Sequence, residues 1–231
     1  ALTYRDNGYL PEALLNFMAL IGWNPGGEQE VFTKEELIKL FSLERIQRSD
    51  GIFNLDKLEW LNKEHIKRLT NEDLTAEIEA YIPVEIKNLP GYSHEKLTRI
   101  ALILVERITH FGEVALMADQ GELAYYFEAP AYPKGRLFWK EERDIAKVIA
   151  RLYKLETIIG MIDRENFSKE NVKKAIWNYA EQEGRGQVLW PMRYALSGKD
   201  KSPDPFELAA ILGKEETLER LENAVALFQN D

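Results

Sequence analysis

Residues 9–23 read YLPEALLNFMALIGW, and the spacing of the apolar side chains in this stretch sets the fold class. They recur three or four residues apart, as on one face of an α-helix: Leu14, Leu15, Met18, Leu20 and Ile21. Pro11 suits the first turn of such a helix, where the missing N–H has no partner to lose. Gly22 and the Asn24-Pro25-Gly26-Gly27 run end the pattern. We therefore expect a helix from residue 11 to 22.

The same helical period recurs along most of the chain. Thr33 and Glu36 form the Thr-x-x-Glu pattern of a capping box, and Ser93 and Ser168 stand before further helices. A long helix is expected from about residue 140 to 159, and a polar loop at residues 48–51. There is no convincing pair of strands and no repeat of fixed period. The pattern predicts an all-α protein.

Two breaks divide the chain into three parts. Fresh helix-capping residues appear around Thr70, and residues 129–135 hold two prolines and a glycine close together. We expect the parts to span residues 1–68, 69–135 and 136–231.

The composition mainly excludes kinds of site and indicates little about function directly. The 231 residues are 45% hydrophobic and 30% charged, which is typical of an ordinary soluble globular protein. No cysteine is present, so disulfides and thiolate metal sites are excluded, and the three histidines lie on separate segments, which argues against a histidine metal site. The apolar runs are too short to cross a bilayer, and no secretion signal is recognisable. We expect a cytosolic protein.

Common catalytic motifs are absent from the sequence. It contains no Gly-x-Gly-x-x-Gly, Gly-x-x-x-x-Gly-Lys-Ser/Thr, Gly-x-Ser-x-Gly or His-Glu-x-x-His pattern. Acid pairs such as Glu35-Glu36 and Glu215-Glu216 are typical of solvated helix faces or of first turns, where they complement the helix dipole. We therefore predict no catalytic residue and no metal site in this chain.

The segment from Arg185 to Lys201 stands out by charge. Arg185, Arg193, Lys199 and Lys201 oppose only Asp200, giving +3 within a chain of −9. Glycines and prolines bracket the segment, and planar guanidinium groups suit base edges and phosphates. A surface loop with fortuitous cations is the competing interpretation. A second candidate is Arg107, although it could instead pair with Glu106 or Glu113.

The aromatic residues are expected to be mainly structural. Each tryptophan falls on an apolar face and is predicted to lie in the core: Trp23, Trp60, Trp139, Trp177 and Trp190. The Tyr125-Tyr126-Phe127 run is expected to pack as well, although an exposed ring there could stack on an unpaired base.

Motifs at both ends of the chain match one known family. They are residues 9–16 (YLPEALLN), Gly22-Trp23, residues 57–62 (KLEWLN), 186–189 (GQVL), 191–198 (PMRYALSG), 202–206 (SPDPF) and 212–215 (LGKE). With these motifs in order, the chain resembles bacterial glutamyl-tRNA synthetases of class I, from just after the KMSKS-type loop onwards. The family's HIGH-type and KMSKS-type sequences do not occur here.

This resemblance implies a layout and an activity. It implies a stem-contact region at residues 1–68, followed by two subdomains of an anticodon-binding cage at residues 69–135 and 136–231. The parent enzyme would use ATP and Mg to attach glutamate to its tRNA. The chain itself is expected to be a segment of that enzyme, without cofactor and inactive alone. Its expected partner is the tRNA for glutamate, with no DNA and no membrane, and it is expected to be a monomer.

The resemblance also implies residue roles. Arg193, with Ser202 and Pro205, would meet the first two anticodon bases, and Arg107 the third. Candidates for the tRNA backbone are Arg185, Lys199, Lys201, Lys57, Lys67 and Arg68.

Two alternatives stay open at this point. The chain could be a helical protein-interaction scaffold that binds no RNA. It could also come from a relaxed ligase that charges the glutamine tRNA too, a question that would be decided at Arg107.

Overall fold

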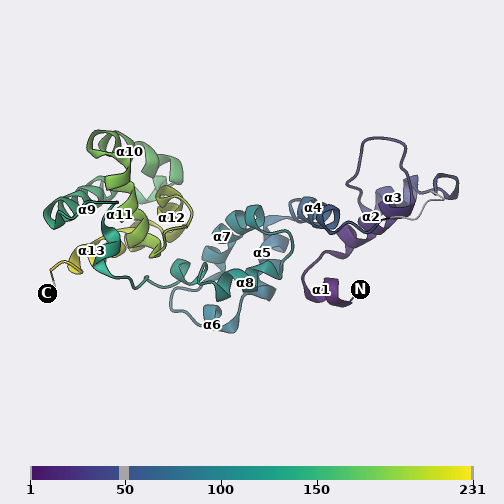
Figure 1. Ribbon diagram of the computed structural model, residues 1–231, viewed down its shortest axis with the longest axis horizontal. Coiled ribbons are helices and arrows are strands. Elements are labelled where there is room, and N and C mark those ends of the chain that lie inside the picture. The colour runs from purple at the N-terminus through teal and green to yellow at the C-terminus, as the bar shows by residue number, and fades with distance from the viewer. Residues whose placement is uncertain (1, 47–51, 230–231) are drawn as a thin grey trace. The chain divides into compact units, whose positions relative to one another are not determined.

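The computed structural model describes residues 2–46 and 52–229, and these residues form helices and their connections (Figure 1). The single β-type contact among them is an isolated bridge between Trp23 and Ile46. The expected all-α class is therefore confirmed. The polar loop predicted at 48–51 lies outside the described residues.

The helices fall into two groups along the chain. The first group is α1 (Leu2–Asp6), α2 (Pro11–Gly22), α3 (Lys34–Leu40), η1 (Leu43–Arg45), α4 (Leu55–Ile66), α5 (Asn71–Tyr81), α6 (Val84–Lys87), α7 (His94–Arg107) and α8 (Glu113–Asp119). The second group is η2 (Ala124–Tyr126), η3 (Lys134–Leu137), α9 (Ile145–Gly160), η4 (Arg164–Asn166), α10 (Lys169–Glu183), α11 (Arg185–Ser197), α12 (Pro205–Leu212) and α13 (Lys214–Ala226).

The chain folds into two compact units. The first comprises Ala1–Val84 and Leu97–Gln120, and the second comprises Glu85–Lys96 and Gly121–Asp231. The three-part division at residues 68 and 135 stays a prediction.

Local capping sets several helix starts as expected. Thr33 and Glu36 form the predicted capping box at α3, and the Ser168 side chain caps α10. The long helix α9 begins at Ile145 rather than near residue 140. Asp144 accepts a hydrogen bond from the Lys147 amide at 3.2 Å and so caps the helix, while Lys140 has a φ of 50°, which no α-helix allows.

The first unit is centred on α2 and α4, with Tyr9, Phe17, Leu58 and Leu61 in its core. Asn62, fully buried on α4, ties this core together. Its Oδ1 accepts from the Leu10 amide at 2.8 Å, and its Nδ2 donates to the Thr109 carbonyl at 2.5 Å. One side chain thereby joins the start of α2 to the turn that follows α7.

A second buried polar network lies beside it. Asn16 donates from Nδ2 to the Glu30 carbonyl at 3.0 Å, and its Oδ1 accepts from the Phe32 amide at 2.8 Å. His65 Nε2 lies 3.1 Å from the same Oδ1. Since that oxygen can only accept, the His65 ring donates from Nε2. Burial, and then the positive charge of Arg68, lowers the pKa of His65 below its ordinary value.

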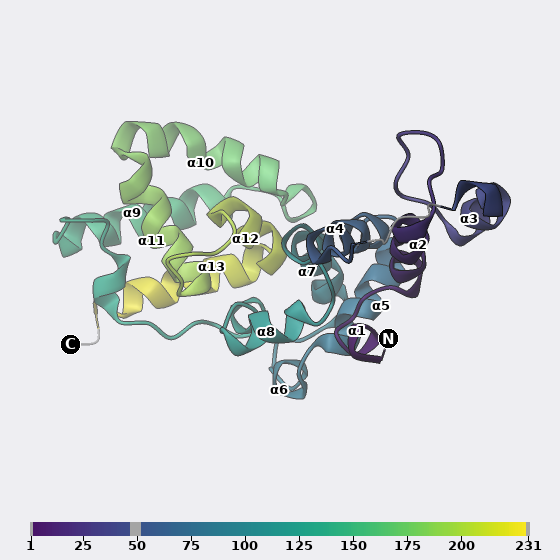
Figure 2. The same ribbon diagram turned by 45° about the vertical axis from the view of Figure 1, so that its right-hand side comes forward.

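In the second unit, α11 packs against α9, α10, α12 and α13 (Figure 2). Arg220 of α13 is 1% exposed and donates from Nη1 to the carbonyls of Tyr125 (2.7 Å) and Leu196 (2.5 Å). Its Nη2 pairs with Glu216, which also binds Lys96 at 2.7 Å. Glu216 thus lies in the first turn of α13, one of the two positions expected for it, and also belongs to a partly buried charge network.

The tryptophan prediction is largely wrong. Only Trp23 belongs to the core, whereas Trp60 is 41% exposed and Trp139, Trp177 and Trp190 are partly exposed. Cations cover several of these rings, for example Lys57 over Trp60 and Arg185 over Trp177. The packing role expected for Tyr125-Tyr126-Phe127 is confirmed, because all three side chains are buried.

We expect Asn62→Ala to lower the free energy of unfolding by about 3 kcal/mol, because two hydrogen bonds are lost and a partly buried N–H and C=O are left without partners. Urea unfolding followed by circular dichroism measures the change. Asn178→Ala, at an exposed position of α10, is the control and should stay within about 0.5 kcal/mol. Equal effects of the two changes would contradict the role given to Asn62.

We expect the stability of the first unit to fall as pH drops below 6.5, the ordinary pKa of histidine. Between that pH and the lowered pKa of folded His65, the unfolded chain binds more protons, so acid favours unfolding. His65→Gln keeps a donor towards Asn16 but does not titrate in this range. Urea midpoints at pH 7.5 and 5.5 should therefore differ less for the variant than for the wild type.

Candidate functional site

Arg193 sits on α11, one turn before the helix ends. Gly184, with a φ of 100°, breaks the chain between α10 and α11, and Gly198 ends α11 in the left-handed region. The Arg193 side chain is half-buried, and its Nη1 lies 3.5 Å from the Asp200 carbonyl. Within the described residues, no carboxylate pairs with it. Its charge is therefore available to a ligand.

The carboxylate of Asp200 binds side chains other than Arg193. It accepts hydrogen bonds from the Tyr194 hydroxyl and from Nη2 of Arg136, and Arg136 Nε donates to the Tyr194 oxygen at 2.9 Å. These two donors, Tyr194 first, lower the pKa of Asp200. The loop after α11 is thereby anchored, with the Asp200 carbonyl facing Arg193.

This loop carries the other predicted residues of the segment. Lys199 is half-buried and Lys201 exposed, and neither has an ion-pair partner among the described residues. Ser202 is partly exposed, with its Oγ 3.0 Å from the Pro203 carbonyl. Pro205 is buried in the first turn of α12, so its ring positions that helix and does not face solvent.

Arg185 differs from these cations. It lies at the start of α11, pairs with Glu181 at 2.5 Å and stacks over the Trp177 ring with its Cζ 4.6 Å from the centroid. The Glu181 carboxylate offsets the positive charge of Arg185. In this respect Arg185 differs from Arg193.

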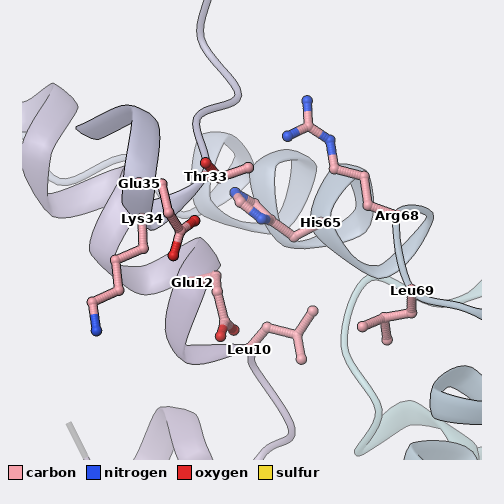
Figure 3. Close-up of a pocket in the computed structure, with 8 residues that line it drawn as sticks. All are labelled: Leu10, Glu12, Thr33, Lys34, Glu35, His65, Arg68 and Leu69. Atoms are coloured by element: carbon pink, nitrogen blue, oxygen red, sulfur yellow. The ribbon is translucent and has the colours of Figure 1, made fainter. Parts of the chain in front are cut away.

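In the first unit, two of the three predicted cations are likewise neutralised. Lys57 pairs with Glu30, and Lys67 pairs with Glu64 at 3.0 Å. Arg68 forms no ion pair within the described residues, and its Nη2 lies 3.4 Å from the Val31 carbonyl. It borders a hollow of about 330 Å³ whose lining side chains Figure 3 shows: Leu10, Glu12, Thr33, Lys34, Glu35, His65, Arg68 and Leu69.

Arg107 is the last residue of α7 and is exposed. It belongs to the first compact unit, whereas Arg193 belongs to the second. Arg107 also interacts with another part of this protein.

The structure therefore brings together four of the predicted residues, Arg193, Lys199, Lys201 and Ser202, on one turn and loop. The sequence analysis missed Arg136 and Tyr194, which hold that loop. Arg136 lies 64 residues from Asp200, so no local pattern could have indicated the contact.

Other kinds of site receive no support. Among the described residues, no group of three or more His, Cys, Asp or Glu side chains could hold a metal ion. The helices found in those residues are also all too short or too polar to cross a membrane.

A family model described as an anticodon binding domain matches residues 57–225, which is most of the chain and includes the Arg193 segment. The chain belongs to the anticodon-binding domain family. A second model, described as the catalytic domain of class I tRNA synthetases for E and Q, matches residues 1–60.

Curated relatives extend this finding. A glutamate–tRNA ligase of Bacteroides thetaiotaomicron is 33% identical over 229 residues, and one of Clostridium botulinum is 36% identical over 223 residues. These matches cover 98% and 93% of this chain, but only 43% and 42% of the relatives. The chain thus spans less than half the length of the curated relatives that it matches.

A solved structure agrees. The crystal structure of a glutamate tRNA ligase from Elizabethkingia meningosepticum is 29% identical, with a TM-score of 0.75 over 96% of this chain and 42% of that one. This match spans nearly the whole chain and agrees with the two family models, which together cover residues 1–225.

Proposed function

We propose that this chain is the tRNA-reading part of a glutamate–tRNA ligase, and that it recognises the anticodon loop of the tRNA for glutamate. The observation that carries the proposal is the turn and loop at residues 193–202. In a chain of net charge −9, three cations there have no carboxylate partner within the described residues: Arg193, Lys199 and Lys201. Sequence-specific RNA recognition relies on unpaired bases whose edges and faces are free, as in an anticodon loop.

The residue roles that we propose combine the family resemblance with the contacts in the structure. We propose that Arg193 donates forked hydrogen bonds to one of the first two anticodon bases and that Ser202 adds an adaptable donor or acceptor. Pro205 acts indirectly, by fixing the start of α12. For the RNA backbone, we place Lys199, Lys201 and Arg68 ahead of Arg185, Lys57 and Lys67, because a glutamate offsets the charge of each of the latter three.

The longer protein supplies the chemistry in this proposal. It uses ATP, with Mg, to attach glutamate to the tRNA, and the segment at residues 1–68 braces the tRNA stem between the two ends. This chain alone binds the tRNA without forming glutamyl-adenylate. We further propose that it acts as a monomer in the cytoplasm.

We expect Arg193→Ala to weaken binding of the glutamate anticodon stem-loop about 30-fold, corresponding to about 2 kcal/mol for a forked arginine contact to a base. In the variant, changing either of the first two anticodon bases should weaken binding less than it does in the wild type. Fluorescence titration at two salt concentrations measures both. Arg164→Ala, which removes an exposed arginine paired with Glu215, is the control and should bind like the wild type.

Two results of that titration would overturn the proposal. One is wild-type binding that is equally strong for an unrelated stem-loop. The other is a complete absence of RNA binding, which would favour the protein-interaction scaffold instead.

We expect Arg107→Ala to reduce the preference for the glutamate over the glutamine anticodon, which differ at the third base, by about tenfold, within the range of one base contact. Discrimination at the first two bases should persist. Competition between the two stem-loops measures the ratio, and Arg99→Ala, on the same helix, is the matched control. A wild-type chain without this preference would indicate a ligase of relaxed specificity.

A further inference from the structure

A hollow of about 370 Å³ lies next to the Arg193 turn, within the second compact unit. One wall is the irregular segment around Ala129, Pro130 and Ala131, together with Ala124 and Tyr125 of η2. The other wall is the end of α11, Ser197 to Lys199. Small and apolar side chains thus line most of a space that borders the candidate loop.

Its irregular wall offers main-chain hydrogen-bonding groups. Within the described residues, the N–H groups of Ala129 and Ala131 and the carbonyls of residues 129–131 have no hydrogen-bond partner. Ala129 and Ala131 are exposed, so water satisfies these groups in the free protein. Such groups can pair with the edge of a nucleobase without any change in side chains.

At two positions the backbone conformation and the close approach of the walls favour glycine. Gly198 has a φ of 64°, and a Cβ on it would lie 2.7 Å from Pro130 Cβ. Gly121 has a φ of 71°, and a Cβ on it would lie 2.9 Å from Lys199 Nζ. The Lys199 ammonium group is therefore held at the edge of the hollow. Glu128 lines the same space, where its carboxylate can accept from an amino group of a base.

We propose that this hollow binds one unpaired nucleotide of the RNA loop, adjacent to the bases that Arg193 contacts. The base lies flat against Pro130 and its neighbouring alanines, and its edge pairs with the free main-chain groups. Lys199 contacts the phosphate on one side of it. This assignment rests on the proposed function and adds a second base-binding subsite to it.

Continuity and charge favour RNA over an apolar peptide. Ser197 and Lys199 belong both to the hollow and to the turn that follows Arg193, so a chain held by Arg193 passes the hollow directly. A cation without a carboxylate partner and a row of unpaired amide groups are complementary to a phosphate and a polar base edge.

An abasic scan of the anticodon stem-loop tests the subsite. Each loop nucleotide in turn is replaced by an abasic one, and binding to the wild-type chain is compared with binding to Ala124→Leu, which fills the hollow, and to Lys199→Met, which removes the charge. Ala175→Leu, at an exposed position of α10, is the control for added bulk.

The expected result is one loop position, outside those sensitive to Arg193→Ala, where loss of the base weakens wild-type binding roughly tenfold. That penalty vanishes in Ala124→Leu and persists in Ala175→Leu. Lys199→Met weakens binding of every stem-loop and lowers the salt dependence of binding. If Ala124→Leu fails to fold, Ala131→Leu replaces it, since that side chain is exposed.

A penalty that survives in the filled variant, or a scan with no such position, overturns the subsite. Either result leaves the proposed function intact as long as the wild type still distinguishes anticodons. Conversely, a wild type that ignores the anticodon overturns the proposed function, while the abasic scan still decides whether the hollow takes a base.

Discussion

The buried guanidinium of Arg220 is the interaction on which the second unit depends. From one nitrogen it donates to the Tyr125 carbonyl in η2 and to the Leu196 carbonyl near the end of α11, so it fixes both walls of the hollow at once. Burying a cation is costly, and burial lowers the pKa of Arg220. Glu216 offsets that cost by pairing with it, and removing one partner of such a pair typically costs about 3–5 kcal/mol. The geometry of the turn and loop that follow Arg193 thus depends on a residue that is itself buried.

Ion pairing within the protein determines which cations remain for a ligand. Arg185, Lys57 and Lys67 look equivalent to Arg193 in the sequence, yet each is offset by a nearby glutamate. Exposed pairs of this kind add little stability, but the nearby carboxylate weakens the attraction that an approaching phosphate meets. The difference in charge pairing between these arginines and lysines therefore comes from their neighbours in space.

Features set by neighbours in sequence were predictable. The capping box at Thr33, the first-turn proline at Pro11 and the all-α class follow from local hydrogen bonding and helical period. Long-range features were not. Glu216 and Arg220 have the i, i+4 spacing of an exposed pair, and the packing that buries Arg220 comes from other segments. The tryptophan prediction was wrong for a different reason. The apolar pattern assigns these rings to the core, whereas in the structure cations lie over rings that stay partly exposed, such as Trp60 and Trp177. The family motifs predicted a role for Arg193, but they gave no indication that Arg136 binds Asp200 in the loop that follows.

Asp200 is an acidic residue within a segment that carries an excess of cations. Counted by sequence, its charge cancels one of the four cations between residues 185 and 201. In the structure, Tyr194 and Arg136 donate hydrogen bonds to its carboxylate, and Arg136 comes from a distant part of the chain. The Asp200 carbonyl, and not its carboxylate, faces Arg193. The acid therefore holds the loop in shape while leaving the arginine charge uncancelled. An acidic chain can bind RNA at such a place because local pairing, rather than net charge, sets the potential there.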